Sequence, residues 1–323
     1  MKKVRLAALA ASLLAAFGAH AAEKIRFGLS WVAEAEHCGF FQAKAAGLYE
    51  KAGLDVEIVN GGPDRNLPLQ VGAGDLQLAM GSSFTTLHML KNGVQAQTVA
   101  AFFQKDPQTL VAHPDQGIKS LEDLKGKPIM VAKFSQQEYW QFLKRKYGFT
   151  DEQLRPYTYS ATPFLVNPQA VQQGYITEDA MLLGKAMPKP PVSILLADYG
   201  YRNYQDTVFG LKSYIEAKPQ VVQAFIDASR AGWQQCLTGD YTPAMKGVLA
   251  MNPEHGEELF HFKMKQTKER GLVDSGDART LGIGAMTDAR WKEFFDVMAA
   301  SGVFPASLDY RSAYTLKFLK AKP

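Results

Sequence analysis

The sequence has few of the residues from which metal centres and redox sites are usually built. Its 323 residues include two cysteines, Cys38 and Cys236, and six histidines. Neither cysteine belongs to a C-x-x-C pair and the histidines are scattered, so we expect neither a metal ion nor a cofactor. The two cysteines fit buried apolar positions, or a disulfide if the protein is exported.

The motifs of common catalytic centres are also missing. There is no G-x-S-x-G, no P-loop, no G-x-G-x-x-G and no H-E-x-x-H. The stretch Gly282-Ile283-Gly284 lacks the third glycine of a dinucleotide fingerprint and falls in a region that reads as helical. We therefore expect no catalytic residues and a protein that is not an enzyme.

Hydrophobic runs long enough to cross a membrane are absent. Residues 6–17 are apolar but too few to span a bilayer, and they lie between a basic start at 2–5 and an A-x-A site at 19–21. This pattern predicts a signal peptide over 1–21 and export, which in a Gram-negative cell means the periplasm. Loss of its three basic residues lowers the formal net charge from +4 to about +1, so no nucleic-acid partner is expected.

Short apolar strands that alternate with helices make up the first two thirds of the chain. This alternation is typical of βαβ units and a parallel sheet. The last third reads as helices only, and we expect these helices to pack back onto the first α/β unit. Strands are expected at 25–29, 54–59, 76–80, 97–103, 109–113, 127–131, 157–160 and 192–196, and the expected helices include 166–173 and 311–318.

The turn between the first strand and the first helix carries aromatic and polar side chains. Trp31, Glu34, Glu36 and His37 follow the strand's carboxyl end, where open α/β sheets bind small molecules. An indole stacks on flat rings, and carboxylates and imidazole pair with ring nitrogens and amines. In the alternative interpretation, Trp31 fills the core and the polar residues cap the helix.

Other strand ends carry further candidates. Ser82 and Ser83 precede a helix, where hydroxyl and N–H groups suit a polar ligand group but also serve as plain caps. Tyr175 and Glu178 offer an aromatic face and an acid, although Thr177 could form a capping box there. The candidate ligand-binding residues are Trp31, His37, Ser82, Ser83, Phe102, Tyr175, Glu178 and Asp198.

Phe102 and Asp198 are the least determined of these candidates. Phe102 and Phe103 are adjacent in a strand and point to opposite sides, so at most one of them faces a crevice. Asp198 ends a strand and could contact a ligand or cap the segment that follows.

The order of these features resembles a known family. The segments that carry the likeness are EHCGFFQAKAAGLY at 36–49, GLDV at 53–56, SLEDLKGK at 120–127, QGYITE at 173–178, ADYG at 197–200 and VQAFIDA at 222–228. They resemble the NMT1/THI5-like branch of ABC-transporter solute-binding proteins, and the resemblance covers nearly all of the chain after residue 21.

The resemblance implies a type II periplasmic-binding-protein fold, in which two α/β lobes close on a ligand by hinge motion. Lobe 1 would comprise residues 22–108 and 208–323, and lobe 2 residues 109–207. It also implies a monomer that delivers its ligand to an ABC permease and ATPase at the inner membrane. Branch members bind thiamine-precursor pyrimidines, and Trp31 and Glu178 match the aromatic and acidic positions that those members use.

Two other functions stay open. Relatives bind sulfonates, taurine or nitrate, but aromatic walls with acids suit a neutral or amine-bearing pyrimidine better than an anion, which needs arginine or a bare helix N-terminus. The branch also contains an enzyme that makes the pyrimidine from its own histidine and has a cysteine-rich motif. This chain lacks that motif and carries an export signal, although His37 and His88 are available.

Overall fold

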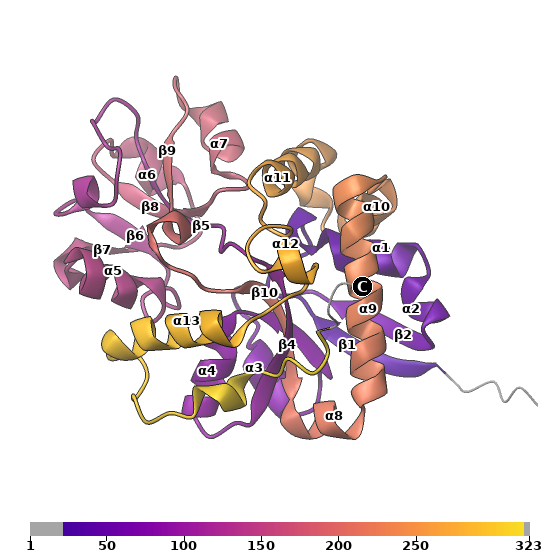
Figure 1. Cartoon of the computed structure of the whole chain (residues 1–323). Helices are drawn as coiled ribbons and strands as arrows, with labels where there is room; N and C mark the ends of the chain where they lie inside the picture. Colours follow the sequence, from indigo (N-terminus) through magenta and orange to yellow (C-terminus); the bar gives the residue numbers. More distant parts are fainter. Residues whose placement is uncertain (1–21, 320–323) are drawn as a thin grey trace, which may run out of the picture.

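The protein folds around two five-stranded sheets, each covered by helices (Figure 1). The computed structural model describes residues 22–319, so the predicted signal peptide lies outside the described residues. The first sheet has the order β2 (Leu54–Val59), β1 (Glu23–Gly28), β3 (Leu78–Gly81), β10 (Gln205–Leu211), β4 (Ala96–Phe103). The second has the order β7 (Leu154–Pro156), β6 (Ile129–Val131), β8 (Val171–Tyr175), β5 (Gln108–Ala112), β9 (Val192–Leu195).

Each sheet contains one strand that runs against the others. In the first sheet β1, β2 and β3 are parallel, and β10 is antiparallel to both of its neighbours. In the second sheet β5 has the same position, antiparallel to β8 and β9. Each reversed strand follows directly after the chain has crossed from the other sheet, over 104–107 before β5 and over 200–204 before β10. The expectation of a parallel sheet is therefore wrong for these two strands. The chain enters each of them from the opposite sheet, at the end where the neighbouring strands finish, so the strand runs in the reverse direction.

Helices cover the faces of both sheets. Those before residue 205 are α1 (Cys38–Ala45), α2 (Leu48–Lys51), α3 (Leu67–Gly72), α4 (Ser83–Lys91), α5 (Tyr139–Tyr147), α6 (Thr162–Val166) and α7 (Asp179–Leu182). Those after it are α8 (Lys212–Ala217), α9 (Pro219–Thr238), α10 (Thr242–Met251), α11 (Glu257–Glu269), α12 (Ala278–Leu281) and α13 (Asp288–Ala300). The run of helices after the last strand confirms the helical character of the final third.

Two of the predicted helices are wrong. The helix expected over 166–173 is instead the end of α6, a turn, and the start of β8. Asn167 precedes Pro168 and has an extended backbone (φ −119°, ψ 97°), because the proline ring disfavours a helical residue before it. The helix expected over 311–318 is a single 3-10 turn at Tyr310–Ala313.

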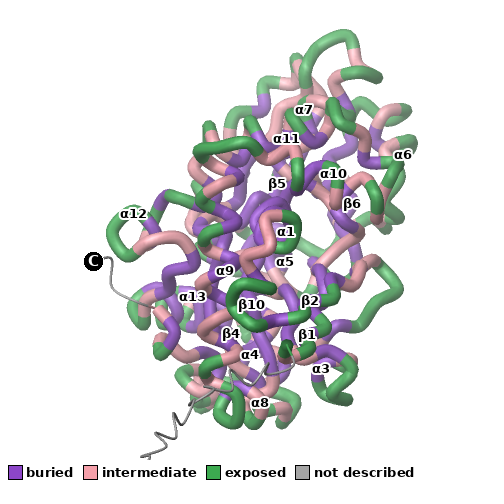
Figure 2. Tube along the Cα trace, turned by 90° about the vertical axis from the view of Figure 1, so that its right-hand side faces the viewer, coloured by how far each residue is buried: buried purple, intermediate pink, exposed green. Residues whose placement is uncertain are grey.

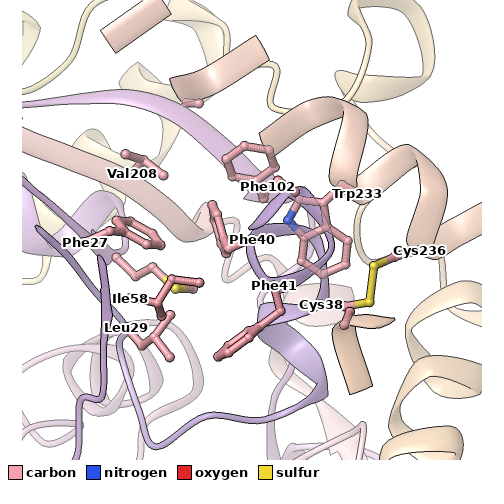
Figure 3. Close-up of a cluster of buried hydrophobic side chains, with 14 of the residues drawn as sticks. Phe27, Leu29, Cys38, Phe40, Phe41, Ile58, Phe102, Val208, Trp233 and Cys236 are labelled. Atoms are coloured by element: carbon pink, nitrogen blue, oxygen red, sulfur yellow. A yellow bond between two sulfur atoms is a disulfide. The ribbon is translucent and has the colours of Figure 1, made fainter. Parts of the chain in front are cut away.

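Helices α1 and α9 cross at close range and are joined covalently. Cys38 of α1 and Cys236 of α9 form a disulfide, which settles whether the two cysteines pair (Figure 3). A Cβ atom at Gly232 would lie 2.1 Å from the backbone oxygen of Gly39, so only glycine permits this approach. The long α9 runs beside the first sheet, and its Trp233 side chain packs into the core beneath α1 (Figures 1 and 3).

The C-terminal helices reach both sheets. Helix α9 packs on α1 and β2 of the first unit, whereas α13 packs against α5. Phe294 of α13 meets Tyr201, with ring centroids 5.8 Å apart, and joins a core cluster that includes Leu110 and Ile129 of the second sheet. Buried positions run through the middle of the molecule and exposed ones along its rim (Figure 2). No helix within residues 22–319 has the length and hydrophobicity needed to cross a membrane.

Candidate functional site

A cavity of about 1080 Å³ lies between the two sheets. The β1–α1 turn, the start of α3 and the start of α4 line it from the first sheet, and the segments after β6, β7 and β8 line it from the second. The crossing segments contribute Asp106 and Tyr201, and the start of β10, directly after the second crossing segment, contributes Asp206. The ionisable acids and bases among the lining residues are Glu34, Glu36, Asp64, Asp106, Glu138, Glu178, Asp206, Arg65, His88 and Lys263.

Lys263 of α11 binds carboxylates from both sides of the cavity. Its Nζ atom lies 2.7 Å from Glu34, 3.2 Å from Glu36 and 2.6 Å from Glu178. The Lys263 side chain is 2% exposed, so its charge needs these partners. Glu34 and Glu36 come from the β1–α1 turn and Glu178 comes from the segment after β8. The ion cluster therefore joins the two halves of the molecule.

A hydrogen bond strengthens the same junction. The Thr177 hydroxyl donates to Glu36 Oε1 at 2.5 Å, and both side chains are buried. Thr177 thus hydrogen-bonds Glu36 across the cavity. It does not form the capping box that was the alternative interpretation of this threonine. Burial raises the pKa of Glu36, but Lys263 and the Thr177 hydroxyl outweigh burial and hold this pKa below its ordinary value.

Burial raises the pKa of several carboxyl groups at the cavity, including one that is bonded to Lys263. Burial raises the pKa of Glu34 to about 8, with the nearby Glu36 as the second cause. Burial also raises the pKa of Asp106 to about 6. For Glu138 and Asp206, burial and neighbouring acids raise the pKa well above its ordinary value. The cavity therefore favours groups that donate hydrogen bonds or carry positive charge.

Aromatic rings form the walls. Trp31 from the first side lies 5.1 Å from Tyr159 of the second, measured between ring centroids. Phe84 of α4 meets Phe134 across the cavity at 5.9 Å, edge to face. Tyr159 and Phe134 are more than half exposed, which leaves their faces available to a ligand. Such rings suit a flat ring or an organic cation.

Four of the sequence-predicted residues line this cavity. They are Trp31, Ser82, Tyr175 and Glu178. Ser82 is also the N-cap residue of α4, and its backbone N–H donates to Thr85 Oγ1 at 3.0 Å, so its capping role and its position at the cavity coexist. The aromatic partner of Trp31 is Tyr159, whereas the sequence suggested Tyr175 or Phe102.

The other four lie elsewhere among the described residues. Phe102 is fully buried between Phe40 and Trp233, so the stacking role expected for it is wrong (Figure 3). Its strand, β4, is the edge strand of the first sheet, and its end is covered by the Phe40 ring of α1 and the Trp233 ring of α9. Asp198 is exposed and faces Lys105 at 3.8 Å instead of the cavity.

His37 and Ser83 have structural contacts. His37 Nδ1 accepts from the Glu34 backbone N–H at 3.2 Å, and burial lowers the pKa of His37 to about 3, so the ring is neutral. Ser83 Oγ accepts from the Tyr204 backbone N–H at 3.2 Å, and the Ser83 backbone N–H donates to the Tyr204 carbonyl at 3.0 Å. Ser83 thus holds the second crossing segment in place.

The sequence did not lead to Lys263, Glu138, Asp206 or Tyr159 as site residues. For Lys263 a signal existed, because the buried positions of α11 are Phe260, Lys263, Met264 and Thr267. A lysine in this apolar stripe must meet buried carboxylates. Within residues 22–319, no group of three or more acids, histidines and cysteines is arranged to hold a metal ion.

Comparison with known proteins gives a binding protein and an enzyme among the relatives. The riboflavin-binding protein RibY of Chloroflexus aurantiacus is 20% identical over 317 residues, which is 92% of this chain and 86% of RibY. The 4-amino-5-hydroxymethyl-2-methylpyrimidine phosphate synthase of Schizosaccharomyces pombe is 26% identical over 106 residues, or 33% of this chain and 31% of the synthase.

Solved structures share the fold at low identity. The alkanesulfonate-binding protein SsuA of Xanthomonas axonopodis pv. citri superposes with a TM-score of 0.65 at 14% identity, over 90% of this chain and 98% of SsuA. The protein therefore has the fold of periplasmic binding proteins. The model of the family described as NMT1/THI5 like matches residues 34–239, more than half of the chain. The chain belongs to the NMT1/THI5-like family.

Proposed function

We propose that the protein is the solute-binding component of an ABC importer and captures a small planar heterocycle, such as a thiamine-precursor pyrimidine, between its two sheets. The observation that carries this proposal is the cavity itself, which is lined from both sheets and bridged by two short crossing segments. Closure of two halves around such a site is how hinged binding proteins hold a ligand. Residues 22–108 with 208–323, and 109–207, are proposed as the two moving lobes.

The walls support a flat, hydrogen-bonding ligand. Trp31 and Tyr159 offer ring faces from opposite sides, and Glu178, which is bonded to Lys263, offers an acceptor in the same cavity. Riboflavin and the pyrimidine named in the two relatives are flat heterocycles with ring nitrogens, which such a site would bind.

Export to the periplasm is part of the same proposal. The disulfide between Cys38 and Cys236 is of a kind that persists in oxidising compartments. It agrees with the signal peptide expected over 1–21. A monomer that docks on an inner-membrane permease is the corresponding assembly.

An anion is the less suitable ligand. Among the described residues that line the cavity, the permanent cations are Lys263, already paired with three carboxylates, and Arg65, which is exposed. A sulfonate entering this site would meet Asp106, Asp206 and Glu138 without a matching charge.

An enzymatic role is also disfavoured by the chemistry of the lining residues. The carboxylates around Lys263 outweigh its burial and raise the pKa of Lys263 well above its ordinary value. This keeps the amine protonated, so it is no nucleophile. His88 lines the cavity and stacks on Phe84 at 5.4 Å, and it is the histidine on which an enzymatic role would depend.

Calorimetric titration of purified protein with aminopyrimidines, riboflavin and an alkanesulfonate tests the proposal. We expect one heterocycle to bind at one per chain and Trp31→Ala to weaken it at least tenfold, with Trp31→Phe retaining most of the affinity. Leu182→Ala, an exposed apolar residue outside the cavity lining, is the matched control and should bind as wild type.

Two outcomes would overturn this assignment. One is tighter binding of the sulfonate than of every heterocycle, which would make the protein an anion carrier. The other is conversion of a bound pyrimidine, or a mass change at His88 during incubation, which would indicate an enzyme.

A further inference from the structure

Asp206 is an acid at the cavity without a bonded partner. Asp206 is only 5% exposed, and it lines the cavity from the start of β10, directly after the second crossing segment. Among the described residues, no side chain or backbone group forms a hydrogen bond or an ion pair with its carboxyl. Its backbone is left-handed, with φ +48°, a conformation that costs energy for a residue with a side chain. A buried, strained and unpartnered carboxyl indicates a group awaiting a ligand.

Two more acids face the same space. Asp106, on the first crossing segment, accepts from the Gln108 backbone N–H at 2.9 Å and from Asn203 Nδ2 at 2.8 Å. Both donors are neutral, so they orient the carboxylate without balancing its charge. Glu138, at the start of α5, lies against Ser82 and near Asp106. Acids from three separate segments therefore converge on one region.

Tyr175 marks the centre of this region. It lines the cavity together with Asp106, Asp206, Glu34 and Glu138, and after burial these acids are the causes that raise the pKa of the Tyr175 hydroxyl. Two cations act on these acids: Lys263, which already bonds Glu34, Glu36 and Glu178, and Arg290, which lowers the pKa of Asp106. The acids around Tyr175 thus outnumber the positive charge that the described residues supply.

We propose that the ligand of this cavity is an organic cation, whose positively charged nitrogen group is bound by Asp206 together with Asp106 and Glu138 and is enclosed by the aromatic walls. This inference rests on the proposed binding function and names the class of ligand. Aromatic faces attract a cation through their ring quadrupole, and desolvated carboxylates supply the counter-charge. A protonated amine or a quaternary nitrogen on a flat ring has both features.

Proton release follows from this arrangement. Burial and neighbouring acids raise the pKa of Asp206 and of Glu138 well above its ordinary value, which favours the protonated form of both groups in the free protein. The charged groups around Asp206 are Glu36, Glu34, Asp106 and Lys263, so acids dominate its surroundings. A bound cation stabilises the ionised carboxylates and so lowers these pKa values, which means that binding expels protons and affinity rises with pH over the range in which the free protein still holds them.

Matched ligand pairs that differ in charge test the proposal by calorimetry at pH 7. One pair is 4-amino-5-aminomethyl-2-methylpyrimidine, an ammonium at this pH, against its neutral 5-hydroxymethyl analogue. The other is choline against 3,3-dimethylbutan-1-ol, which has the same shape without the charge. We expect the cation of at least one pair to bind at least tenfold tighter than its neutral partner. The binding enthalpy should also differ between phosphate and Tris buffers, because protons are released.

Asp206→Asn is the decisive variant. Asparagine has the same shape and tolerates the left-handed backbone, so the fold should persist. We expect the variant to lose roughly ten- to a hundredfold in affinity for the cation and little for the neutral partner. Glu138→Gln is a second variant with the same expectation, and Asp198→Asn, an exposed acid outside the cavity lining, is the control.

The outcomes separate the two proposals. If the neutral pyrimidine binds as tightly as the ammonium form and choline binds no tighter than its neutral partner, the cation inference is wrong and the pyrimidine function stands. If choline binds over its neutral partner but neither pyrimidine binds, the cation inference stands and the pyrimidine function fails. If no cation is preferred in either pair, or Asp206→Asn leaves the preference intact, the cation inference is overturned.

Discussion

Lys263 fixes the positions of the carboxylates that surround it at the cavity. Its ammonium group lies within 3.2 Å of carboxylates from both sides of the molecule. A buried ion cluster of this kind contributes little net stability compared with an apolar packing, but it is costly to break on one side only. The cluster holds Glu178 and Glu36 in fixed positions at the cavity, which a ligand can then use.

Lys263→Met should destabilise the protein by about 3–5 kcal/mol at neutral pH, because it leaves several buried carboxyls without a counter-charge. The loss should shrink as the pH falls and these carboxyls take up protons. Urea unfolding monitored by tryptophan fluorescence measures both effects. Lys265→Met on the same helix is the control, since Lys265 is 67% exposed and should change stability by less than about 1 kcal/mol. Equal stability of the two variants would contradict the role given to Lys263.

Asp179 gives a separate, pH-dependent test. Its carboxyl accepts from the Thr109 hydroxyl at 2.6 Å and from the Tyr175 backbone N–H at 3.0 Å. Burial raises the pKa of Asp179 to about 7, so the folded protein holds this proton more tightly than the unfolded chain. The stability from this proton is present at low pH and is lost as the pH rises through about 7.

The free energy of unfolding should therefore respond differently to pH in wild type and Asp179→Asn. As the pH falls from about 7 toward the ordinary range of an aspartate, near 4, wild type should gain stability relative to the variant. Denaturant titrations of both proteins across this range give the difference. A difference in unfolding free energy that does not change with pH, or that favours wild type at high pH, would show that Asp179 is ionised in the folded protein.

At the scale of elements, the crossing of α1 and α9 fixes the first sheet to its C-terminal helices. Gly39 and Gly232 lie where the two helices touch, and a Cβ atom at Gly39 would meet the Trp233 ring at 2.1 Å. The disulfide between Cys38 and Cys236 closes the same contact. The turn that carries Trp31, Glu34 and Glu36 directly precedes α1, so this contact also positions the cavity wall.

Gly232→Ala should lower stability by about 1–3 kcal/mol, because its methyl group would press on the Gly39 backbone. Thermal unfolding should show a lower midpoint. Gly72→Ala is the matched control, since Gly72 is helical and a Cβ atom there meets nothing within 4 Å, so the change should be neutral or slightly stabilising. An unchanged midpoint for Gly232→Ala would mean that the helices can separate freely.

The sequence predicted element types well where local pattern decides them. Alternating strands and helices, and the family motifs, led to two α/β halves and a helical final third. The reversed direction of β5 and β10 was not predictable from local pattern, because it depends on which sheet the chain has just left. At 166–173 the pattern was misread although Pro168 marked a helix end.

The same distinction between local sequence pattern and tertiary packing applies to the site residues. Trp31, Tyr175 and Glu178 follow strand ends, where general rules for α/β sheets place ligand contacts, and they do line the cavity. Phe102 also ends a strand but belongs to a core that only packing reveals. Lys263 and Asp206 come from far along the chain and reach the cavity through the tertiary fold.

At the scale of the whole molecule, two sheets enclose one cavity, and two short crossing segments join them. Asp106 lies on the first crossing segment and Asp206 lies at the start of β10, directly after the second, so a ligand that binds both contacts the part of the chain about which the halves would move. Ligand contact and closure are then coupled, as expected of a binding protein that presents its closed form to a transporter.

Native mass spectrometry of the protein isolated from its own source tests the central claim most directly. The expected result is one small molecule per chain that is a flat, nitrogen-containing compound, is recovered chemically unchanged on unfolding, and is absent from Trp31→Ala prepared in the same way. Recovery of a sulfonate, or of a compound that is chemically converted during incubation with the protein, would contradict the claim that the protein captures a heterocycle without transforming it.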